Sequence, residues 1–572
     1  MKIHDLFSGR QVFLVAVLLG VLLALPTLGS GLVLDDYQQR ITLLTGGGGN
    51  VFEFFHRGTA AGEAQMQSGV LAWWTHPDTK VVFFRPAAQW LVKLDYWLWP
   101  NSLLMMHLHS VLWYALAVFV AGMSYRQLMP TRWAAGLAAI LFAVDAAHGP
   151  AVAWLANRNA FVGLSAALLA LLCYRQRQFY WHIAGCGLFA LSLACSEGAL
   201  AITGYFFAYE LYLSEQRWHL RILRLLPYAL VAMAWLALWK HGGYGTAGPG
   251  WYIDPAGEPS VFLYKMLLRI PFYLVGQLFL PPVEILALTE DSAALVYACT
   301  YAVVVVGLLA WLLLPLLRGS RLARFFGLGM LIAAIPICGS IPVSRALWFV
   351  GFGATGLLAL FIEQFRSLPL SPARLRYGAA FAMTMLVLHL WISPLLFVGY
   401  GKLGDVMDGN MDTRRVQLAD DGAPGKKVLA LAASSYVGNI TFPLLKDRAL
   451  SLGAAPTRPV PSISRIRALA EGNGEFELTR KDADTLVVSC AAGLDGLRPS
   501  RYGFSAGDRV ALDDVDIVVQ SVSPARAPTV IEYRFHPGVL ETYEVIAWEG
   551  DHFVPAALPA PGASFGVKAT GS

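Results

Sequence analysis

Long apolar stretches alternate with short polar ones over residues 1–400 of the chain. Eleven of these stretches are long enough to cross a bilayer as a helix, or nearly so when paired with a neighbour. They are residues 11–31, 103–123, 133–144, 151–173, 180–194, 199–213, 225–239, 293–316, 325–341, 346–362 and 377–400. The pattern predicts a polytopic α-helical membrane protein with about eleven transmembrane helices.

One further apolar stretch, residues 261–282, differs from the others. It contains Lys265, Arg269, Pro271 and the pair Pro281-Pro282. Irregular or charged backbone at membrane depth is tolerated where it lines protein rather than lipid. We therefore expect a re-entrant or interfacial element that stays on the outer side.

The composition agrees with this class, since 56% of the residues are hydrophobic, only 14% are charged, and the mean hydropathy is +0.54. Lys and Arg in short loops mark the cytoplasmic side. With the N-terminus inside, every basic short loop falls inside and an odd number of crossings puts the C-terminus outside. These loops carry Lys2 and Arg10, Arg126 and Arg132, Arg175 and Arg177, Arg217 with Arg221 and Arg224, Arg318 with Arg321 and Arg324, and Arg366 with Arg374 and Arg376.

The same topology gathers the polar residues of otherwise apolar regions at the outer ends of the helices. They are Asp35, Asp36, Asp145, His148, Arg158, Glu197 and Arg345. A charge at hydrocarbon depth costs roughly 2.5 to 3.5 kcal/mol, so such residues suggest function. The alternative for Asp35 and Asp36 is that they only mark the interface and stop the first helix. Mixed carboxylates, imidazole and guanidinium on one side favour a single site.

Residues 35–101 form a long first outer loop. It contains the run Gly46 to Gly49, the segment Trp73-Trp74-Thr75-His76-Pro77-Asp78, and an amphipathic stretch at residues 89–99. Trp90, Trp97 and Trp99 suit the headgroup layer, so this stretch is expected to lie along the membrane surface. It either roofs the site and contacts substrate or serves as an interfacial anchor.

Several short motifs of the membrane part occur in the order typical of one family. They are Leu34-Asp35-Asp36-Tyr37, Phe84-Arg85-Pro86, His107-Leu108-His109, Asp145-Ala146-Ala147-His148, Asn157-Arg158-Asn159, Cys195-Ser196-Glu197 and Ser344-Arg345-Ala346. Together they resemble the GT-C glycosyltransferases, and among these the bacterial relatives of the protein O-mannosyltransferases with TPR repeats. The resemblance covers residues 1–400.

The resemblance implies an inverting transferase that takes a sugar from a polyprenyl-phosphate donor and joins it to an acceptor on the outer face. An acceptor hydroxyl needs a positioned base, which makes Asp35 the candidate and Asp36 the alternative base or the residue that orients it. A phosphate leaving group calls for Arg. Arg345 is the candidate phosphate ligand and Arg158 the second choice.

The remaining polar residues, Arg85, Asp145, His148 and Glu197, are expected to form a hydrogen-bonded network in the site. A divalent cation held by Asp145 and His148 with His76 or Asp78 is the less favoured alternative, so no metal or other cofactor is expected.

The chain also departs from the family. The family commonly has His-Pro-x-His at residues 145–148 and an acidic residue after the Arg at 158, and no TPR repeats follow the membrane part. The sugar therefore stays open, as does the acceptor, which could be a protein, a lipid or an envelope polymer. Membrane lipids are expected partners and nucleic acid is not.

Residues 402–572 are polar, rich in Pro and Gly, and predicted to fold as a separate extracytoplasmic α+β domain. Expected strands are residues 428–433, 485–490, 509–521, 529–536 and 540–548, expected helices are 439–452 and 462–472, and the tail from about residue 556 is expected to fray. Asp513, Asp514 and Asp516 are expected to be solvated positions of a strand.

Two other functions compete with the transferase. A transporter or flippase of lipid-linked sugars would show polar residues at the midplane and matched halves, neither of which is evident. The third possibility is a GT-C-like scaffold without catalysis. The resemblance places the protein in a bacterial inner membrane, with a cytoplasmic N-terminus and a periplasmic or extracellular C-terminal domain.

Overall fold

A computed structural model describes residues 11–46, 49–248, 252–289, 292–368, 371–402, 425–452, 463–472, 474–494, 497–498, 500–550, 552–568 and 570–571. Lys2 and Arg10, used above for the orientation, lie outside these residues. The chain forms two compact units. The helical unit comprises Met1–Val33, Phe83–Tyr244 and Trp251–Asp405, and the sheet unit comprises Leu34–Val82, Gly245–Gly250 and Val406–Ser572.

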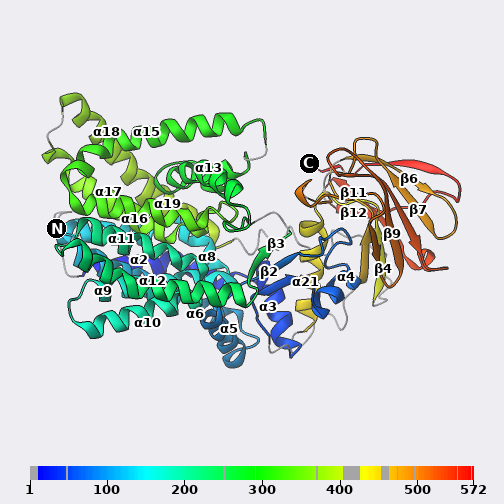
Figure 1. The fold of residues 1–572 in the computed structure, drawn as a ribbon, viewed down its shortest axis with the longest axis horizontal. Coiled ribbons are helices and arrows are strands. Elements are labelled where there is room, and N and C mark those ends of the chain that lie inside the picture. The colour runs from blue at the N-terminus through cyan, green and yellow to red at the C-terminus, as the bar shows by residue number, and fades with distance from the viewer. Residues whose placement is uncertain are drawn as a thin grey trace. The chain divides into compact units, whose positions relative to one another are not determined.

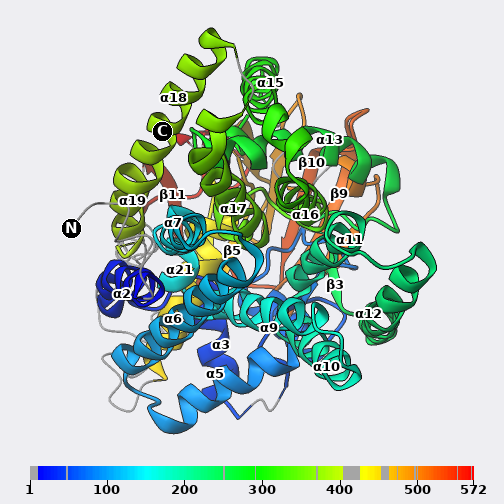
Figure 2. The same cartoon turned by 90° about the vertical axis from the view of Figure 1, so that its left-hand side faces the viewer.

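Helices of the helical unit lie side by side as a bundle (Figures 1 and 2). They are α2 (Val12–Ala24), α5 (Pro86–Leu98), α6 (Leu103–Leu128), α7 (Arg132–Ala143), α8 (Gly149–Ala153), α9 (Asn159–Tyr174), α10 (Phe179–Cys195), α11 (Thr203–Tyr212), α12 (Trp218–His241), α13 (Pro259–Leu278), α14 (Val283–Ala287), α15 (Leu295–Gly319), α16 (Arg321–Ile337), α17 (Trp348–Gln364), α18 (Pro372–Val387) and α19 (Ser393–Tyr400). Short helical turns η2 (Ala146–His148), η3 (Leu155–Arg158), η4 (Glu197–Ile202), η5 (Ser344–Ala346) and η7 (Leu388–Ile392) connect some of them.

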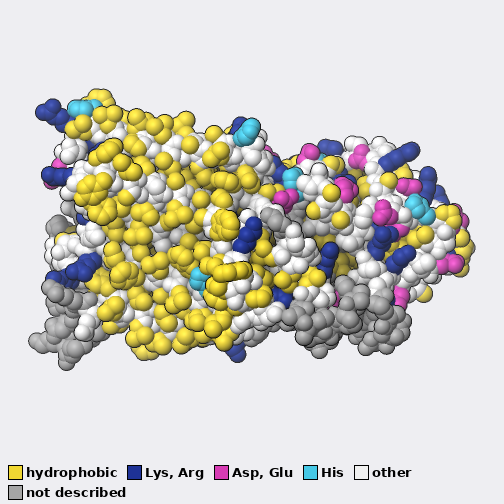
Figure 3. Space-filling view, turned by 90° about the horizontal axis from the view of Figure 1, so that it is seen from below, with side chains coloured by type: hydrophobic (Ala, Val, Ile, Leu, Met, Phe, Trp, Pro, Cys, Tyr) yellow, Lys and Arg dark blue, Asp and Glu magenta, His cyan; other side chains and the backbone are white. Residues whose placement is uncertain are grey.

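In the described part of the chain, eight helical segments are long and apolar enough to cross a membrane, or nine if the bent pair α7 and Ala146–Ala153 counts as one span. The predicted class, a polytopic helical membrane protein, is confirmed, and the face of the helical unit seen in Figure 3 is mainly hydrophobic. The expected count of eleven is too high. The stretches at Phe179–Cys195, Thr203–Tyr212 and Arg321–Ile337 form helices shorter than a typical span.

Residues 261–282, expected as a re-entrant or interfacial element, contain most of one continuous helix, α13, which meets the requirements for a crossing. The charge of Arg269 does not face lipid, because this residue is buried and its Nη1 donates to Cys338 O and Ser340 O, both at 2.8 Å. The guanidinium thus satisfies carbonyl groups beyond the end of α16. On which side of the membrane this segment lies stays a prediction.

Helix α17 runs through the centre of the helical unit and is buried over most of its length. Small residues allow the close approach: a Cβ on Gly353 would lie 2.5 Å from the hydroxyl of Tyr205 and 2.8 Å from Phe326 O. Tyr205 and Tyr125 in turn donate to Phe349 O and Phe352 O at 2.5 and 2.8 Å. These contacts fix the N-terminal end of α17, which follows directly on the turn η5.

The sheet unit contains three sheets and the helices α3 (Asp35–Leu44), α4 (Ala60–Ser68) and α21 (Phe442–Ser451). A small sheet joins β1 (Glu53–His56), β2 (Lys80–Val82) and β3 (Gly245–Ala247). A six-stranded antiparallel sheet has the order β13 (Ser564–Lys568), β6 (Glu475–Arg480), β7 (Thr485–Ser489), β10 (Pro528–Phe535), β9 (Val515–Val522) and β8 (Arg509–Ala511). The third sheet has the order β12 (His552–Pro555), β11 (Glu544–Gly550), β4 (Lys426–Ala430) and β5 (Ile463–Ala468), with β14 (Thr570–Gly571) beside β11.

Most of the predicted outer loop, up to Val82, belongs to the sheet unit, which corrects the division at residues 401/402. Trp73 and Trp74 are buried in the core of this unit, and the Trp73 indole donates to Ala468 O at 3.1 Å. Apolar residues of a loop need a core, and here the core comes from strands almost 400 residues away in the chain. The α5 helix, predicted at residues 89–99, lies in the helical unit.

The C-terminal α+β class is confirmed, with three corrections. Residues 463–468 form the strand β5 rather than a helix, because β5 pairs in parallel with the buried strand β4. The tail does not fray over its described residues, since β13 pairs with β6. Asp514 is not solvated: it lies in the turn between β8 and β9 with 2% of its surface exposed.

Candidate active site

The site in the helical unit starts at the break between α7 and α8. Helix α7 ends at Ala143, and the chain turns by 43° before it continues. Asp145 supports the turn, because its Oδ1 accepts from Ala147 N at 3.0 Å, as a helix cap does. Ser393 holds the break from the start of α19, donating to Val144 O at 3.0 Å and accepting from Ala146 N at 2.7 Å.

The other carboxylate oxygen of Asp145 accepts from the Gln277 amide at 2.7 Å. Asp145 is only 5% exposed. Among the described residues, no Lys, Arg or His nitrogen lies within ion-pair distance of it. A buried carboxylate held only by amides is costly in a membrane protein, and such residues are as a rule functional.

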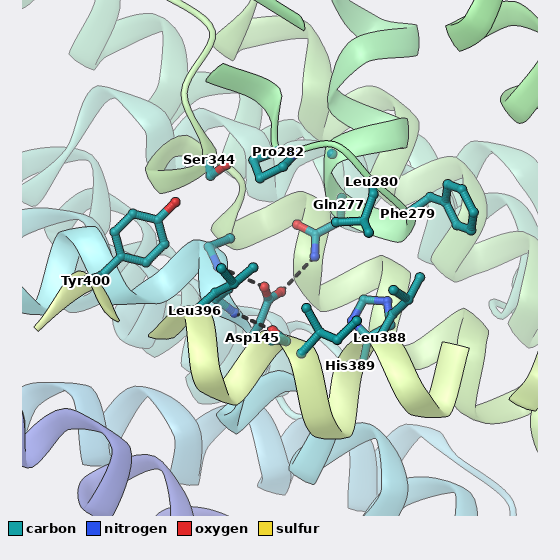
Figure 4. Close-up of a pocket in the computed structure, with 15 residues that line it drawn as sticks. Asp145, Gln277, Phe279, Leu280, Pro282, Ser344, Leu388, His389, Leu396 and Tyr400 are labelled. Atoms are coloured by element: carbon teal, nitrogen blue, oxygen red, sulfur yellow. Dashed lines mark hydrogen bonds between the residues drawn. The ribbon is translucent and has the colours of Figure 1, made fainter. Parts of the chain in front are cut away.

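Asp145 and Gln277 line a small, partly open pocket with a cavity volume of about 50 Å³ (Figure 4). One part of its wall is polar and the other apolar. The polar residues are Asp145, Gln277, Ser344, His389, Ser393 and Tyr400, and the large apolar residues are Phe279, Leu280, Leu388, Ile392 and Leu396. This lining suits a ligand with a polar head and a hydrocarbon chain.

A π-helical turn, η7, brings His389 to this wall. Such turns insert an extra residue into a helix and occur frequently at functional sites. Here the turn separates α18 from α19 and sets Leu388, His389 and Ile392 toward the pocket, as the close-up shows for the first two.

The turn η5 contributes the remaining polar groups. Ser344 donates to both carboxylate oxygens of Glu284, from its N–H at 2.6 Å and from its hydroxyl at 2.7 Å. The next residue, Arg345, lies with its guanidinium carbon 4.4 Å from the ring centre of Trp154, in a cation–π contact. The guanidinium thus contacts the Trp154 ring, and the residue before Arg345, Ser344, lines the pocket.

Arg158, the second phosphate candidate, is part of a different site. It is 3% exposed and donates to the Asp95 carboxylate at 2.5 Å, to Ser110 Oγ at 2.9 Å and to Met106 O at 2.8 Å. His109 completes the cluster, 2.6 Å from the other oxygen of Asp95. All three nitrogens of the guanidinium have partners, so Arg158 joins α5, α6 and η3.

Arg85 and Glu197 are brought together as predicted for a polar network, although apart from the pocket lining. Arg85 Nε donates to Glu197 Oε2 at 2.7 Å, and Phe84 N donates to Glu197 Oε1 at 3.0 Å. This pair ties the start of α5 to η4. His148 is fully buried and stacks on Trp348, with ring centres 3.9 Å apart and planes 5° apart.

Asp35 and Asp36 lie in the sheet unit, where they form the first turn of α3. Acidic residues there favour the positive end of the helix dipole. Asp36 is 2% exposed and Asp35 is half-buried. The structure thus explains why the first predicted helix ends before them, and their catalytic role stays a prediction.

Metal ligands do not gather in the described residues: no group of three or more His, Cys, Asp and Glu side chains could hold an ion. The cluster of Asp145, His148, His76 and Asp78 considered above is therefore absent from the described residues.

Sequence reasoning missed Gln277, Glu284, His389, Ser393 and Tyr400. Gln277 and His389 could have been noticed, because each is a polar residue within an apolar stretch of the sequence. Their convergence on Asp145 depends on how α13 and α19 pack, which no local pattern encodes.

No family model matches the chain, and no curated protein matches it. Solved structures similar to it include three of an oligosaccharyltransferase from the archaeon Archaeoglobus fulgidus. The structure with a tethered acceptor peptide has 12% identity and a TM-score of 0.39, over 81% of this chain and 64% of that one. The apo form has 13% identity and a TM-score of 0.39, over 81% and 65%. The complex of this enzyme, AglB, with an inhibitory peptide and a dolichol-phosphate has 13% identity and a TM-score of 0.37, over 77% and 63%. The chain thus spans less than two thirds of the length of these structures, and similarity at this level assigns neither family nor activity.

Proposed function

We propose that the protein is a membrane glycosyltransferase of the GT-C kind that moves a sugar from a polyprenyl-phosphate donor to an acceptor on the outer face. The observation that carries the proposal is the pocket in the helical unit. Its wall combines long apolar side chains with the buried carboxylate of Asp145, which forms no ion pair within the described part of the chain. A lipid-linked sugar offers both an apolar chain and polar hydroxyl groups to such a wall.

Arg345 is the proposed ligand of the donor phosphate. Its guanidinium carbon lies over the ring of Trp154, and the preceding residue lines the pocket. A planar fork matches two phosphate oxygens and stabilises the negative charge that develops as the phosphate leaves. Arg158 does not fit this role, because its nitrogens already serve Asp95, Ser110 and Met106.

The proposed reaction is an inverting displacement at the anomeric carbon. The acceptor oxygen forms a bond to this carbon while the bond from the carbon to the phosphate oxygen breaks, and the electron pair of that bond leaves with the phosphate. The proton of the acceptor passes to Asp35, and Asp36 is the alternative base or the residue that orients Asp35. These two roles rest on the resemblance of Leu34-Asp35-Asp36-Tyr37 to the family motif and on the chemistry of a hydroxyl acceptor.

Asp145, Gln277 and Ser344 are proposed to bind the sugar of the donor through hydrogen bonds. The network of Arg85 and Glu197 is proposed to position the start of α5. The protein is proposed to act in a bacterial inner membrane, with its N-terminus in the cytoplasm and its sheet unit outside.

The test is a transfer assay on purified protein in lipid, with labelled polyprenyl-phosphate sugars and cell-envelope acceptor. Transfer to acceptor supports the enzyme, whereas movement of intact donor between leaflets, or no loss of sugar from the donor, supports a flippase or a scaffold. Asp35→Asn should lower the rate by roughly two to four powers of ten, the share of general-base catalysis. Asp254→Asn, which changes an exposed Asp of the helical unit, is the matched control. If Asp35→Asn and Asp36→Asn both transfer sugar at the wild-type rate, the proposed mechanism is rejected.

A further inference from the structure

A loop of the sheet unit, Trp73 to Asp78, accepts hydrogen bonds from two arginine side chains of other parts of the chain. Trp73 and Trp74 anchor it in the core of this unit, so the residues that follow have a fixed backbone. Thr75 and His76 come next and are half-buried. The two buried Trp side chains thus hold the backbone carbonyl groups of Trp74 and Thr75 in fixed positions.

Two guanidinium groups converge on one oxygen of this loop. Arg57 Nη1 donates to Thr75 O, and Arg498 Nη2 donates to the same oxygen at 3.5 Å. Arg498 Nε also donates to Trp74 O, and its guanidinium carbon lies 4.0 Å from the ring centre of Phe504. Two like charges share one acceptor here, although the sequence separates them by more than 400 residues.

Carboxylates do not neutralise this pair. Among the described residues, neither Arg57 nor Arg498 forms an ion pair. Glu63 and Asp508 act on them only at longer range, and Arg526 adds a further positive charge near Arg498. Burial, with the repulsion of Arg57 and Arg526, lowers the pKa of Arg498 to about 10.

His76 lies close enough to both guanidinium groups to feel their charge. Its ring centre lies 4.8 Å from that of Tyr502, and its Nδ1 lies 3.8 Å from the carboxylate of Asp78. Burial and the charges of Arg498 and Arg57 lower the pKa of His76 against the opposing effect of Asp78. An anion placed between these groups would relieve the repulsion among them.

We propose that Arg57, His76 and Arg498 form a binding site for a phosphate-type oxyanion, either free phosphate or the headgroup of an anionic lipid. Arginine forks bind oxyanions through paired, charge-assisted hydrogen bonds. Two guanidinium groups and an imidazole exceed what one carboxylate ligand needs and match the several oxygen atoms of a tetrahedral phosphate. The site is separate from the pocket at Asp145 and does not depend on the transferase reaction.

The first test is binding of inorganic phosphate to the full-length protein in a neutral detergent, followed by titration calorimetry and by the midpoint of thermal unfolding. Wild-type protein should bind phosphate saturably and gain thermal stability from it. Arg57→Gln should weaken binding by about ten-fold or more, the effect of losing one hydrogen bond to a charged group. Arg509→Gln, which removes an exposed Arg of the same unit, should bind as the wild type does.

A second arm separates the two sources of the anion. Protein in nanodiscs of phosphatidylcholine is compared with protein in nanodiscs that also contain phosphatidylglycerol, and inorganic phosphate is titrated into both. A lipid ligand predicts that phosphatidylglycerol lowers the apparent phosphate affinity in the wild type and not in Arg57→Gln; free phosphate predicts equal affinity in both bilayers.

The proposal is overturned if the wild type binds phosphate without saturation and shows no preference between the bilayers. It is also overturned if Arg57→Gln and Arg509→Gln bind phosphate equally, because Arg57 and Arg498 then only hold the loop. If Arg498→Gln folds, its phosphate binding is measured as well. If it does not fold, the result for Arg57→Gln alone decides whether the site exists.

Discussion

Two buried carboxylates of the helical unit, Asp95 and Asp145, have opposite surroundings. Asp95 is bonded to Arg158 at 2.5 Å and to His109 at 2.6 Å, and Trp113 donates to the far nitrogen of His109 at 2.8 Å. Among the residues that the structure describes, Asp145 receives hydrogen bonds only from an amide side chain and a backbone N–H, and it borders a pocket.

This difference in partners assigns Asp95 a structural role and Asp145 a role in ligand binding. At Asp95 every charge has a partner, so the cluster is complete and serves to join α5, α6 and η3. At Asp145 the charge is held in place and left without a cation, which costs stability unless a ligand makes use of it. A buried acid of a membrane protein therefore indicates a binding site only when it is known to have no cationic partner.

The largest expected effect concerns the complete cluster. Arg158→Ala leaves Asp95 buried without its guanidinium, and removing one partner of a buried pair typically destabilises by roughly 3 to 5 kcal/mol. We expect a large drop in the midpoint of thermal unfolding or the loss of folded protein. Arg175→Ala, an Arg on the predicted cytoplasmic side that bonds to Gln127, is the control and should change the midpoint little. An Arg158→Ala variant that is as stable as the wild type but fails to bind donor would reverse the roles assigned to Arg158 and Arg345.

The next effect concerns the phosphate ligand. Arg345→Ala should weaken binding of a polyprenyl-phosphate sugar by roughly 1.5 to 3 kcal/mol, the range for a hydrogen bond to a charged group. Arg345→Lys should recover binding only in part, because an ammonium lacks the planar fork and stacks less well on Trp154. Donor binding and unfolding are measured on the same preparations. Unchanged donor binding in Arg345→Ala would exclude it as the phosphate ligand.

The smallest effect concerns a third buried acid, Asp514 of the sheet unit. Arg467 Nη2 lies 2.8 Å from its Oδ1, Arg465 Nη1 lies 3.4 Å from its Oδ2, and Tyr543 donates to it. Burial raises the pKa of Asp514, but the bond and charge of Arg467 outweigh it, so the pKa lies below its ordinary value of 3.8. Like Asp95, this acid has its partners.

A lowered pKa in the folded state stabilises the fold above pH 3.8, and this stabilisation is lost as the pH falls through the folded-state pKa. Wild type should therefore lose stability more steeply below pH 4 or so than Asp514→Asn, which lacks the titrating group. Hydrogen exchange of β5 and β9 against pH measures the difference. Asp516→Asn, at an exposed position of β9, is the control. Parallel curves for wild type and Asp514→Asn would contradict the assignment.

Much of the helical unit follows from the sequence because hydropathy is local. Residues 103–123 and 293–316 lie within α6 and α15, since apolar length alone predicts them. The same local reasoning failed for residues 463–468, where pairing with β4 decides the conformation, and for Trp73 and Trp74, whose core is assembled from a distant part of the chain.

Only some residues of the candidate site could be predicted from the sequence. Asp145 was apparent as a carboxylate in an apolar region, and the structure gives it a pocket. Gln277 and Ser393 could not be assigned, because their role arises from the packing of α13 and α19 against the break after α7. The structural role of Arg158 could not be predicted from the sequence, since only the contact with Asp95 shows that its charge is already paired.

The most direct test compares Asp145→Asn with Asp95→Asn in unfolding midpoint and transfer rate. An Asn at position 145 can accept from Ala147 N and donate to Gln277 Oε1 after a flip of that amide, and this oxygen has no other partner among the described residues. Asp145→Asn should thus be at least as stable as the wild type while its transfer rate falls by about ten-fold or more. Asp95→Asn leaves the buried Arg158 uncompensated and should lose roughly 3 to 5 kcal/mol of stability. The account is contradicted if Asp145→Asn unfolds as readily as Asp95→Asn, or if it folds and transfers sugar at the wild-type rate.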